Sequence, residues 1–479
     1  MSTAGFGNAE KSKQLMDTRA RNAEHLHSVI TSLQELFGER ATQADAILEQ
    51  HGSDESHHSN CPPDIVVFPR STDEVASTVK ICSEASIPIV PYGAGTALEG
   101  HVNAVQGGVC IDLSLMDEIL AINSDDLDCV VQAGVRRKRL NEELRSFGLF
   151  FPIDPGPDAT IGGMAATRAS GTNAVRYGTM SEVVLSLTVV TADGKIIRTR
   201  RRAKKSSAGY DLTHLFVGSE GTLGIITEVT VRLFSIPEST IVARTTFDKL
   251  EDAVTTAMET MQVGLPLARI ELLDDALIAA INSYSSTDFH PANTLFFELH
   301  GSESTVREQM EMLRAIAQEN NSGNFEFAER QEDKTRLWQA RHDAYYAAVR
   351  RRTGAVGWAT DVCVPISRIV ECISETKKDL ENLSVPGCIL GHLGDGNFHV
   401  VFSVDPKSQT EADEIEAFSS RLSHRAIRMD GTCTGEHGVG LGKKKYLEAE
   451  HGNALDIMRT LKTSLDPKNI LNPGKVIDP

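Results

Sequence analysis

The chain has no long apolar segment and no paired cysteine motif. Its longest apolar runs are strand-sized, such as Val183 to Val190, whereas a helix that spans a bilayer needs roughly 18 apolar residues. Any membrane role is therefore expected to be peripheral. The eight cysteines are scattered without a CxxC pair, which is typical of a reducing compartment such as the cytosol or the mitochondrial matrix.

Basic residues are outnumbered by acidic ones. There are 48 Lys and Arg against 66 Asp and Glu, which gives a formal net charge of −18. Such a charge repels phosphate backbones and attracts basic proteins, so nucleic acid is not expected as a partner. The N-terminus carries Glu10, Asp17 and Glu24 and lacks an apolar core segment, so no targeting signal is expected. A homodimer is compatible with this composition.

The 479 residues are too many for one ordinary hydrophobic core, so several domains are expected. Apolar positions at helical spacing predict a helical lead-in and linker over 1–60. Short β-branched runs with a helix at Val75 to Ala85 predict an α+β domain over 61–237. A second alternation predicts another domain over 238–450, before a C-terminal segment, 451–479. Its helices are expected near 248–262, 304–319 and 409–429, and its strands near 294–299, 357–364 and 388–403.

Two glycine-rich segments are suited to a large ligand. Pro91 to His101 follows an apolar strand, and its glycines let backbone amides approach an anion closely. It does not fit a nicotinamide fingerprint, because a strand at Val109 to Leu113 follows where a long helix should begin. Without the other motifs, this segment is explained equally well as a phosphate-binding loop or as a structural turn. The dense small residues from Pro152 to Thr179 leave room for a flat group against the backbone.

With Gly218 to Thr227 and Leu471 to Lys475, these segments form four motifs in order. At these motifs the chain resembles the FAD-linked oxidase family, whose flavin fold is named after vanillyl-alcohol oxidase. The resemblance implies an FAD-binding domain over 61–237 and an α+β substrate and metal-binding cap domain with an antiparallel sheet over 238–450. The C-terminal segment is then expected to return to the FAD domain.

The same resemblance implies the residues that hold FAD. Gly93, Gly95 and Thr96 are expected at the diphosphate, and Pro155 to Gly178 beside the isoalloxazine and ribityl groups. His101 stands where close relatives usually carry glycine. The full set of expected FAD contacts is Pro91, Gly93, Ala94, Gly95, Thr96, Gly100, His101, Pro155, Asp158, Thr160, Gly163, Ala166, Ser170, Gly171, Tyr177, Gly178, Glu220, Gly221, Gly224, Ile226 and Asn472.

A candidate metal site lies in the segment Cys388 to Phe402. Asp395 and Gly396 stand between two apolar runs, which is a strong hairpin signal. A two-residue loop there pairs His392 with His399, with β-carbons roughly 4.5–5.5 Å apart on one face, so both can bind one divalent cation. In an arbitrary protein, two histidines at this spacing are more often a surface pair.

A third metal ligand is expected from the glycine-rich loop Gly431 to Gly440, where a carboxylate and an imidazole are adjacent, Glu436 and His437. Here the motifs most resemble the D-lactate and D-2-hydroxyglutarate dehydrogenase branch of the family. This implies zinc or manganese on His392, His399 and Glu436, with His437 as the catalytic base. The α-hydride of the substrate is then expected to pass to flavin N5 while His437 takes the hydroxyl proton.

The resemblance also implies substrate contacts for Arg341, Trp358, Asn397 and His437. Arg341 ends the family pattern Leu-Trp-x-x-Arg and is expected to bind the substrate carboxylate, although a lone arginine is more often solvated. Trp358 stands where the hydroxyglutarate branch tends to place lysine, so an apolar wall is expected. This favours D-lactate, oxidised to pyruvate, over a dicarboxylate.

No haem, iron–sulfur or nicotinamide motif is present, so the electron acceptor is expected to be external. The resemblance suggests cytochrome c or a quinone, and a mitochondrial location if the source is eukaryotic or a cytoplasmic one otherwise. A basic run between Arg198 and Lys205 suits an anionic membrane or an acidic partner, but a solvated hairpin tip after Ala192 explains it at least as well. D-2-hydroxyglutarate dehydrogenase and a non-catalytic metal protein remain the alternative functions.

Overall fold

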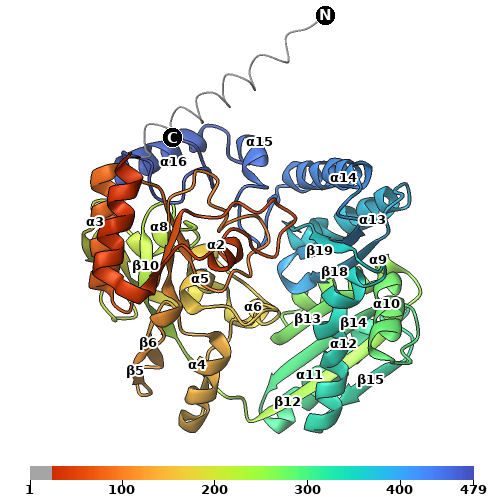
Figure 1. Ribbon diagram of the computed structural model, residues 1–479. Coiled ribbons are helices and arrows are strands. Elements are labelled where there is room, and N and C mark those ends of the chain that lie inside the picture. Colours follow the sequence, from red (N-terminus) through yellow and green to blue (C-terminus); the bar gives the residue numbers. More distant parts are fainter. Residues whose placement is uncertain (1–23) are drawn as a thin grey trace, which may run out of the picture.

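The computed structural model describes residues 24–479 (Figure 1). The expected N-terminal helix is present over 24–37, and its earlier part, 14–23, lies outside the described residues. Val29, Leu33 and Phe37 on this helix pack into the core beneath the first sheet. No helix among residues 24–479 is long and apolar enough to cross a membrane.

The first part of the chain forms two sheets. In the four-stranded sheet β2, β4 and β3 run parallel and β1 antiparallel, whereas the five-stranded sheet, in the order β5-β6-β10-β8-β9, is antiparallel throughout. Strand β4 follows the first glycine loop, as expected. The strands are β1 (Ala41–Thr42), β2 (Ile65–Val67), β3 (Ile89–Tyr92), β4 (Val109–Asp112), β5 (Ile119–Asn123), β6 (Asp128–Gln132), β8 (Val184–Val190), β9 (Ile196–Arg198) and β10 (Ile225–Arg232).

Helices connect these strands, and a separate two-stranded pair lies outside the two sheets. The pair is β7 (Leu149–Phe150) with β11 (Phe234–Ser235). The helices are α2 (Asp45–Gln50), α3 (Thr72–Ala85), α4 (Arg137–Leu144), α5 (Ile161–Thr167), α6 (Ala174–Tyr177), α7 (Met180–Val183) and α8 (Leu212–Phe216). Thr160 caps α5 by accepting a hydrogen bond from the Gly163 backbone, so this helix begins within the second glycine-rich segment.

The second part of the chain forms one large antiparallel sheet, at the right of Figure 1. Its order is β15-β12-β14-β13-β18-β19-β16, and β17 also pairs with β19. The strands are β12 (Ser239–Phe247), β13 (Leu267–Leu273), β14 (Asn293–Gly301), β15 (Phe325–Ala328), β16 (Val356–Ala359), β17 (Val362–Cys363), β18 (Gly387–His392) and β19 (Asn397–Val404). The helices are α9 (Leu250–Gln262), α10 (Asp275–Ser285), α11 (Glu303–Glu319), α12 (Gln331–Val349), α13 (Ile369–Leu380) and α14 (Gln409–Arg428).

Alternation along these strands divides the sheet into two different faces. One face packs an apolar core against α9, α11, α13 and α14, with residues such as Leu295, Phe297 and Phe398. The other face packs against α10 and α12. Toward the ends of β13, β14, β18 and β19 that second face carries polar side chains instead, and these line the cavity described below.

The C-terminal segment returns to the first part of the chain (Figure 1). Leu471 forms a parallel bridge with Ile89 of β3, and buried Lys462 donates to the carbonyl oxygens of Thr222 and Leu471. Its helices are α15 (Leu447–His451) and α16 (Ala454–Leu465). This segment therefore closes over the first glycine loop.

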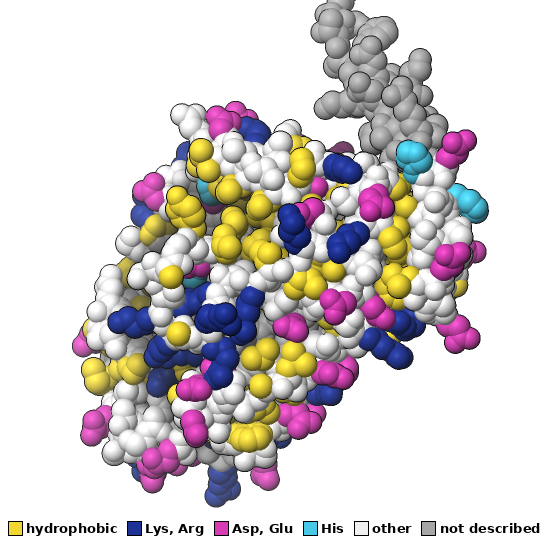
Figure 2. Space-filling model, turned by 90° about the vertical axis from the view of Figure 1, so that its left-hand side faces the viewer, with side chains coloured by type: hydrophobic (Ala, Val, Ile, Leu, Met, Phe, Trp, Pro, Cys, Tyr) yellow, Lys and Arg dark blue, Asp and Glu magenta, His cyan; other side chains and the backbone are white. Residues whose placement is uncertain are grey.

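The helices expected in the second half are α9, α11 and α14, within two residues of their predicted ends. Helix α12 and strands β12 and β13 were not expected. The basic run between Arg198 and Lys205 does not form a hairpin tip. The tip is the β8–β9 turn at residues 191–195, and the basic run begins at the last residue of β9. Most of the run is exposed, and Lys and Arg side chains gather on the face that carries α3 (Figure 2).

Candidate active site

A cavity of about 1630 Å³ lies between the glycine loops of the first part and the polar end of the large sheet. Ligand pockets for drug-sized molecules are usually about 300–1,000 Å³, so this one has room for a dinucleotide and a second small molecule. Its walls include most of the residues expected to contact FAD, namely Pro91, Gly93, Ala94, Gly95, Thr96, His101, Pro155, Thr160, Gly163, Ala166, Ser170, Gly171, Glu220, Gly221, Gly224, Ile226 and Asn472.

Four expected FAD contacts lie beside the cavity and not on its wall: Gly100, Asp158, Tyr177 and Gly178. Asp158 accepts a hydrogen bond from the Lys138 backbone, and the Tyr177 hydroxyl is 2.8 Å from Nδ1 of His300. Asp158 and Tyr177 therefore contact residues that line the cavity, Lys138 and His300.

The first glycine loop depends on the absence of side chains. A β-carbon on Gly93 would overlap the Thr160 hydroxyl, and Gly95 has a φ of +67°, a conformation that disfavours other residues. The loop therefore brings its backbone close to the cavity, as a diphosphate site requires.

We expect Gly93→Ala to weaken FAD binding by roughly 10-fold to 100-fold, because an overlap of this kind costs about 1–3 kcal/mol. Flavin absorbance per protein in the purified variant measures the loss. Gly301→Ala is the matched control, because a β-carbon there meets its nearest neighbour at an ordinary 3.4 Å. Full FAD occupancy in Gly93→Ala after dilution and dialysis would contradict the assignment of this loop.

The three expected metal ligands meet at one wall of this cavity. Nε2 of His392 and Nε2 of His399 each lie 3.2 Å from Oε1 of Glu436, and all three side chains are largely buried. Metal bonds of about 2.0–2.2 Å separate neighbouring ligand atoms by about 3 Å, so the group has the spacing of a divalent cation site.

Both imidazoles are held with the same nitrogen facing Glu436. Nδ1 of His392 lies 2.6 Å from Oε1 of Glu271, and Nδ1 of His399 lies 3.1 Å from the Thr360 carbonyl oxygen. These partners make Nδ1 the protonated nitrogen and leave the Nε2 lone pairs free for a metal. Two imidazoles and a carboxylate with this support fit zinc or manganese.

The hairpin that carries the histidines exists, but its predicted register was wrong. Residues 393–396 form the connection, and His392 pairs with Asn397 while His399 pairs with Leu390. The observed register differs from the expected one by two residues, and a shift of two preserves the face of every side chain. The histidines are therefore diagonal neighbours on one face, with ring centroids 5.6 Å apart.

Asp361 fixes the loop that carries Glu436 and His437. Its Oδ2 atom accepts hydrogen bonds from both of their backbone amides and from the Thr434 hydroxyl. Burial alone would raise the pKa of this carboxyl, but His437 and His399 hold it far below its ordinary value. A buried anion thus holds the loop that carries Glu436 and His437.

His437 is placed for proton transfer. Its ring stacks on His399 with centroids 4.9 Å apart, and its buried Nδ1 has no hydrogen-bond partner among the described residues. Burial lowers the pKa of His437 to about 4, so the imidazole is neutral near pH 7 and retains a lone pair.

Two of the four expected substrate residues line the cavity, Arg341 and His437. Nε of Arg341 donates to Oε2 of Glu271 at 2.7 Å. Asn397 and Trp358 lie elsewhere: the Asn397 amide donates to Asp361 and to the Val362 carbonyl oxygen, and Trp358 stacks on His57 with ring centroids 3.4 Å apart.

His101 is buried beside the FAD loops. Its Nε2 lies 3.2 Å from Oε2 of Glu220, and its backbone amide donates to Asp54. Burial would lower the pKa of His101, but Glu220 and Asp54 raise it above its ordinary value. Glu220 also accepts from the backbone amides of Val439 and Gly440, so it connects the loop that carries Glu436 to the glycine loops of the first part of the chain.

Three charged residues of the site were not foreseen from the sequence: Arg269, Glu271 and Asp361. Two of them have a local signal, because Arg269 and Glu271 are charged residues within the otherwise apolar strand β13. Asp361 lies in the segment that contains Trp358. A charge inside an apolar strand is uncommon unless it is paired, and this pattern was the available sign.

Comparison with protein-family models places the chain in a class. The model for FAD linked oxidases, C-terminal domain, matches residues 236–476, and the model for the FAD binding domain matches residues 63–200. The chain therefore belongs to the FAD-linked oxidase family and is an FAD-dependent oxidoreductase.

Particular relatives narrow this class. A probable mitochondrial D-lactate dehydrogenase of Danio rerio is 50% identical over 455 residues, which cover 94% of this chain and 92% of that protein. A mitochondrial D-lactate dehydrogenase [cytochrome] of Arabidopsis thaliana is 49% identical, covering 87% of this chain and 74% of that one. A D-2-hydroxyglutarate dehydrogenase of Xanthomonas citri pv. viticola is 29% identical, covering 90% and 93%.

Solved structures confirm the vanillyl-alcohol-oxidase-type fold. The 4-ethylphenol oxidase from Gulosibacter chungangensis has a TM-score of 0.80 at 19% identity and covers 95% of this chain and 97% of its own. The p-cresol methylhydroxylase structure has a TM-score of 0.78 at 15% identity and covers 94% and 96%. At such identities the likeness concerns the fold alone.

Proposed function

We propose that this chain is an FAD- and metal-dependent D-lactate dehydrogenase, which oxidises D-lactate to pyruvate and passes the electrons to an external acceptor. The observation that carries this proposal is the His392, His399 and Glu436 cluster, which lines the same cavity as His437, whose Nδ1 has no hydrogen-bond partner among residues 24–479. FAD, when bound, accepts the substrate hydride. A divalent cation, when bound, lowers the pKa of the substrate hydroxyl by several units.

The protein residues divide the remaining work. Arg341 has one guanidinium nitrogen on Glu271 and lines the cavity, so its terminal nitrogens are available for the substrate carboxylate. His437 accepts the hydroxyl proton, and the nearby Asp361 carboxylate stabilises the imidazolium that results.

The choice of D-lactate is supported by the two relatives at 50% and 49% identity, both named D-lactate dehydrogenases. Trp358 supports it less directly than expected, because its ring packs against His57 beside the cavity. D-2-hydroxyglutarate dehydrogenase is the second candidate, favoured by the relative of that name at 29% identity. A non-catalytic metal protein is no longer supported, because the chain belongs to an oxidoreductase family.

Cytochrome c or a quinone is our proposed acceptor, and the net charge of −18 suits a basic cytochrome. If the source is eukaryotic, we propose a mitochondrial location, by analogy with the mitochondrial relatives. Whether the protein forms a homodimer stays a prediction.

The test is anaerobic bleaching of the flavin absorbance with a panel of D- and L-2-hydroxy acids, with and without a chelator. We expect rapid bleaching by D-lactate, little by L-lactate, slower bleaching by D-2-hydroxyglutarate, and loss of bleaching after metal removal. Faster bleaching by the dicarboxylate would establish the second candidate, and bleaching that survives complete metal removal would refute the metal role.

A further inference from the structure

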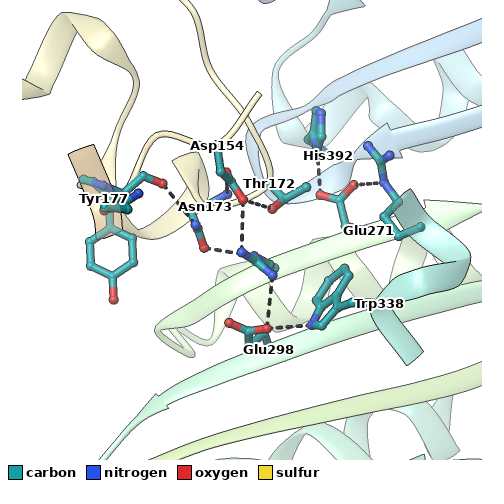
Figure 3. A network of polar contacts seen from close by, with 12 residues as sticks. Asp154, Thr172, Asn173, Tyr177, Glu271, Glu298, Trp338 and His392 are labelled. Carbon is teal, nitrogen blue, oxygen red and sulfur yellow. Dashed lines mark hydrogen bonds and ion pairs between the residues drawn. The ribbon is translucent and has the colours of Figure 1, made fainter. Parts of the chain in front are cut away.

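Strand β13 carries two charged side chains, Arg269 and Glu271, in an otherwise apolar sequence. Because they are two residues apart, both point to the α12 face of the sheet. Arg269 lines the cavity, and Glu271 contacts His392 and Arg341, which also line it. Each side chain is held by several partners (Figure 3). The partners of Arg269 include Asp154 and Asn173 from the loops of the first part of the chain, whereas Glu271 contacts His392 and Arg341.

Arg269 reaches from the large sheet to the loops on the FAD side. Its Nε donates to Asn173 at 3.0 Å, one terminal nitrogen donates to Asp154 at 3.0 Å, and the other donates to Glu298 at 3.2 Å. Its guanidinium also lies over the Trp338 ring, 4.9 Å from the centroid. All three polar groups of the guanidinium are therefore used, which is a rigid arrangement for this side chain.

Asp154 holds two stretches of the FAD-side wall together. Its Oδ1 accepts from the Asn173 backbone amide, and its Oδ2 accepts from the Thr172 hydroxyl. A β-carbon on Gly171 would overlap the Asp154 backbone, so the two stretches are in direct contact. Residues 154–157 and 169–173 both line the cavity.

Glu271 holds two side chains of the proposed metal and substrate site. Its two carboxylate oxygens bind Nδ1 of His392 at 2.6 Å and Nε of Arg341 at 2.7 Å, and it is completely buried. Burial would raise the pKa of Glu271, but His392 and Arg341 hold it below its ordinary value.

Glu298 on the neighbouring strand β14 completes the support of Arg269. It accepts from Nε1 of Trp338 at 2.6 Å and lies 2.6 Å from Nε2 of His300. Burial would raise the pKa of Glu298, but Arg269, followed by His300, lowers it to about 2. Arg269 thus stands between two carboxylates, one from each side of the cavity.

We propose that Arg269 is a positioning residue, which fixes the FAD-lining loops at Asp154 and Asn173 relative to the strand whose Glu271 orients His392. The inference rests on the proposed function, in which FAD and the His392 site cooperate. Hydride transfer requires the donor and acceptor atoms within about 3–3.5 Å, and an error of about 1 Å can cost 10²-fold in rate. Because the side chains of strand β13 contact both sides of the cavity, this strand limits the error in the distance between donor and acceptor atoms.

The test compares Arg269→Lys with Arg244→Lys in the intact holoenzyme. Lysine keeps the charge but cannot make three directed bonds. Arg244 is a suitable control, because it is also largely buried, lies on β12 of the same sheet, pairs with Glu326 and is not part of the cavity wall. We expect Arg269→Lys to retain FAD and metal but to lower the rate constant of anaerobic flavin reduction about 10-fold to 100-fold. Arg244→Lys should stay within about twofold of the unmodified protein.

A second readout does not depend on activity. Amide hydrogen exchange in residues 152–157 and 171–173 is expected to rise in Arg269→Lys and to stay unchanged in Arg244→Lys and in Glu271→Gln. Glu271→Gln should instead lower the metal content. Because Arg269 is expected to act through Asp154, adding Asp154→Asn to Arg269→Lys should produce less than the product of their separate effects.

Unchanged exchange in both loops, or fully multiplicative effects with Asp154→Asn, would overturn the role of Arg269. The proposed function has a separate point of failure, which is an unmodified holoenzyme that no D-2-hydroxy acid bleaches. In that event the exchange comparison of the two arginine variants still decides whether Arg269 holds the loops.

Discussion

His437→Gln is expected to retain FAD and metal but to slow flavin reduction by D-lactate roughly 10²-fold to 10⁴-fold, the usual contribution of a general base. Nδ1 of His437 has no hydrogen-bond partner in the part of the chain that the structure describes, and the ring stacks on the proposed ligand His399 at the cavity wall. Glutamine approximates its size and polarity but cannot accept the proton. Anaerobic stopped-flow measurement of flavin absorbance gives the rate constant.

His424→Gln serves as the control for this variant, because His424 is an exposed residue of α14 whose Nδ1 contacts only the Ser420 carbonyl oxygen. Its rate constant should be unchanged. Reduction of His437→Gln at a near-normal rate would remove the residue from the proposed chemistry. A loss of FAD or metal from this variant would instead assign it to binding.

His392→Ala is expected to lose the metal while keeping FAD. Removal of a supporting residue alone typically costs about 10-fold to 100-fold in metal affinity, so removal of a ligand should cost more. The FAD loops come from the first part of the chain and do not depend on this imidazole. Metal per flavin, measured by elemental analysis, and the rate of flavin reduction should fall together.

The exposed His214 supplies the control for metal binding, since His214→Ala removes an imidazole that contacts only Asp211 and a backbone carbonyl oxygen. It should keep its full metal content. If His392→Ala also keeps a full complement of metal, the cluster with His399 and Glu436 is not the metal site, and the Asp361, His399 and His437 group becomes the alternative.

The hairpin shows how a partly wrong prediction still located the site. The loop was expected to be two residues long, but residues 393–396 form a four-residue connection. The side-chain period of a strand is two, and the error in register was also two, so both histidines stayed on the same face. An error of one residue would have separated them.

The supporting charges show the limit of reading the sequence locally. Glu271 is 121 positions from His392, and Asp361 is 75 positions from Glu436. No local spacing connects such pairs, because their contact depends on the order of strands β13, β18 and β19 in the sheet. Asn397 was likewise assigned to substrate, whereas its amide is directed at Asp361 and Val362.

From the sequence alone, the resemblance to the FAD-linked oxidase family implied the class, the α+β fold, the proposed FAD loops and the proposed metal ligands. The motifs that carry this resemblance are local, because they depend on backbone conformations that glycine permits and on the alternation of side chains along a strand. Only the tertiary structure decided which charges brace the site and that Arg269 joins its two sides. Those contacts form where separate strands and loops meet around one cavity, and a buried charge is tolerated there only when folding brings its partners to it.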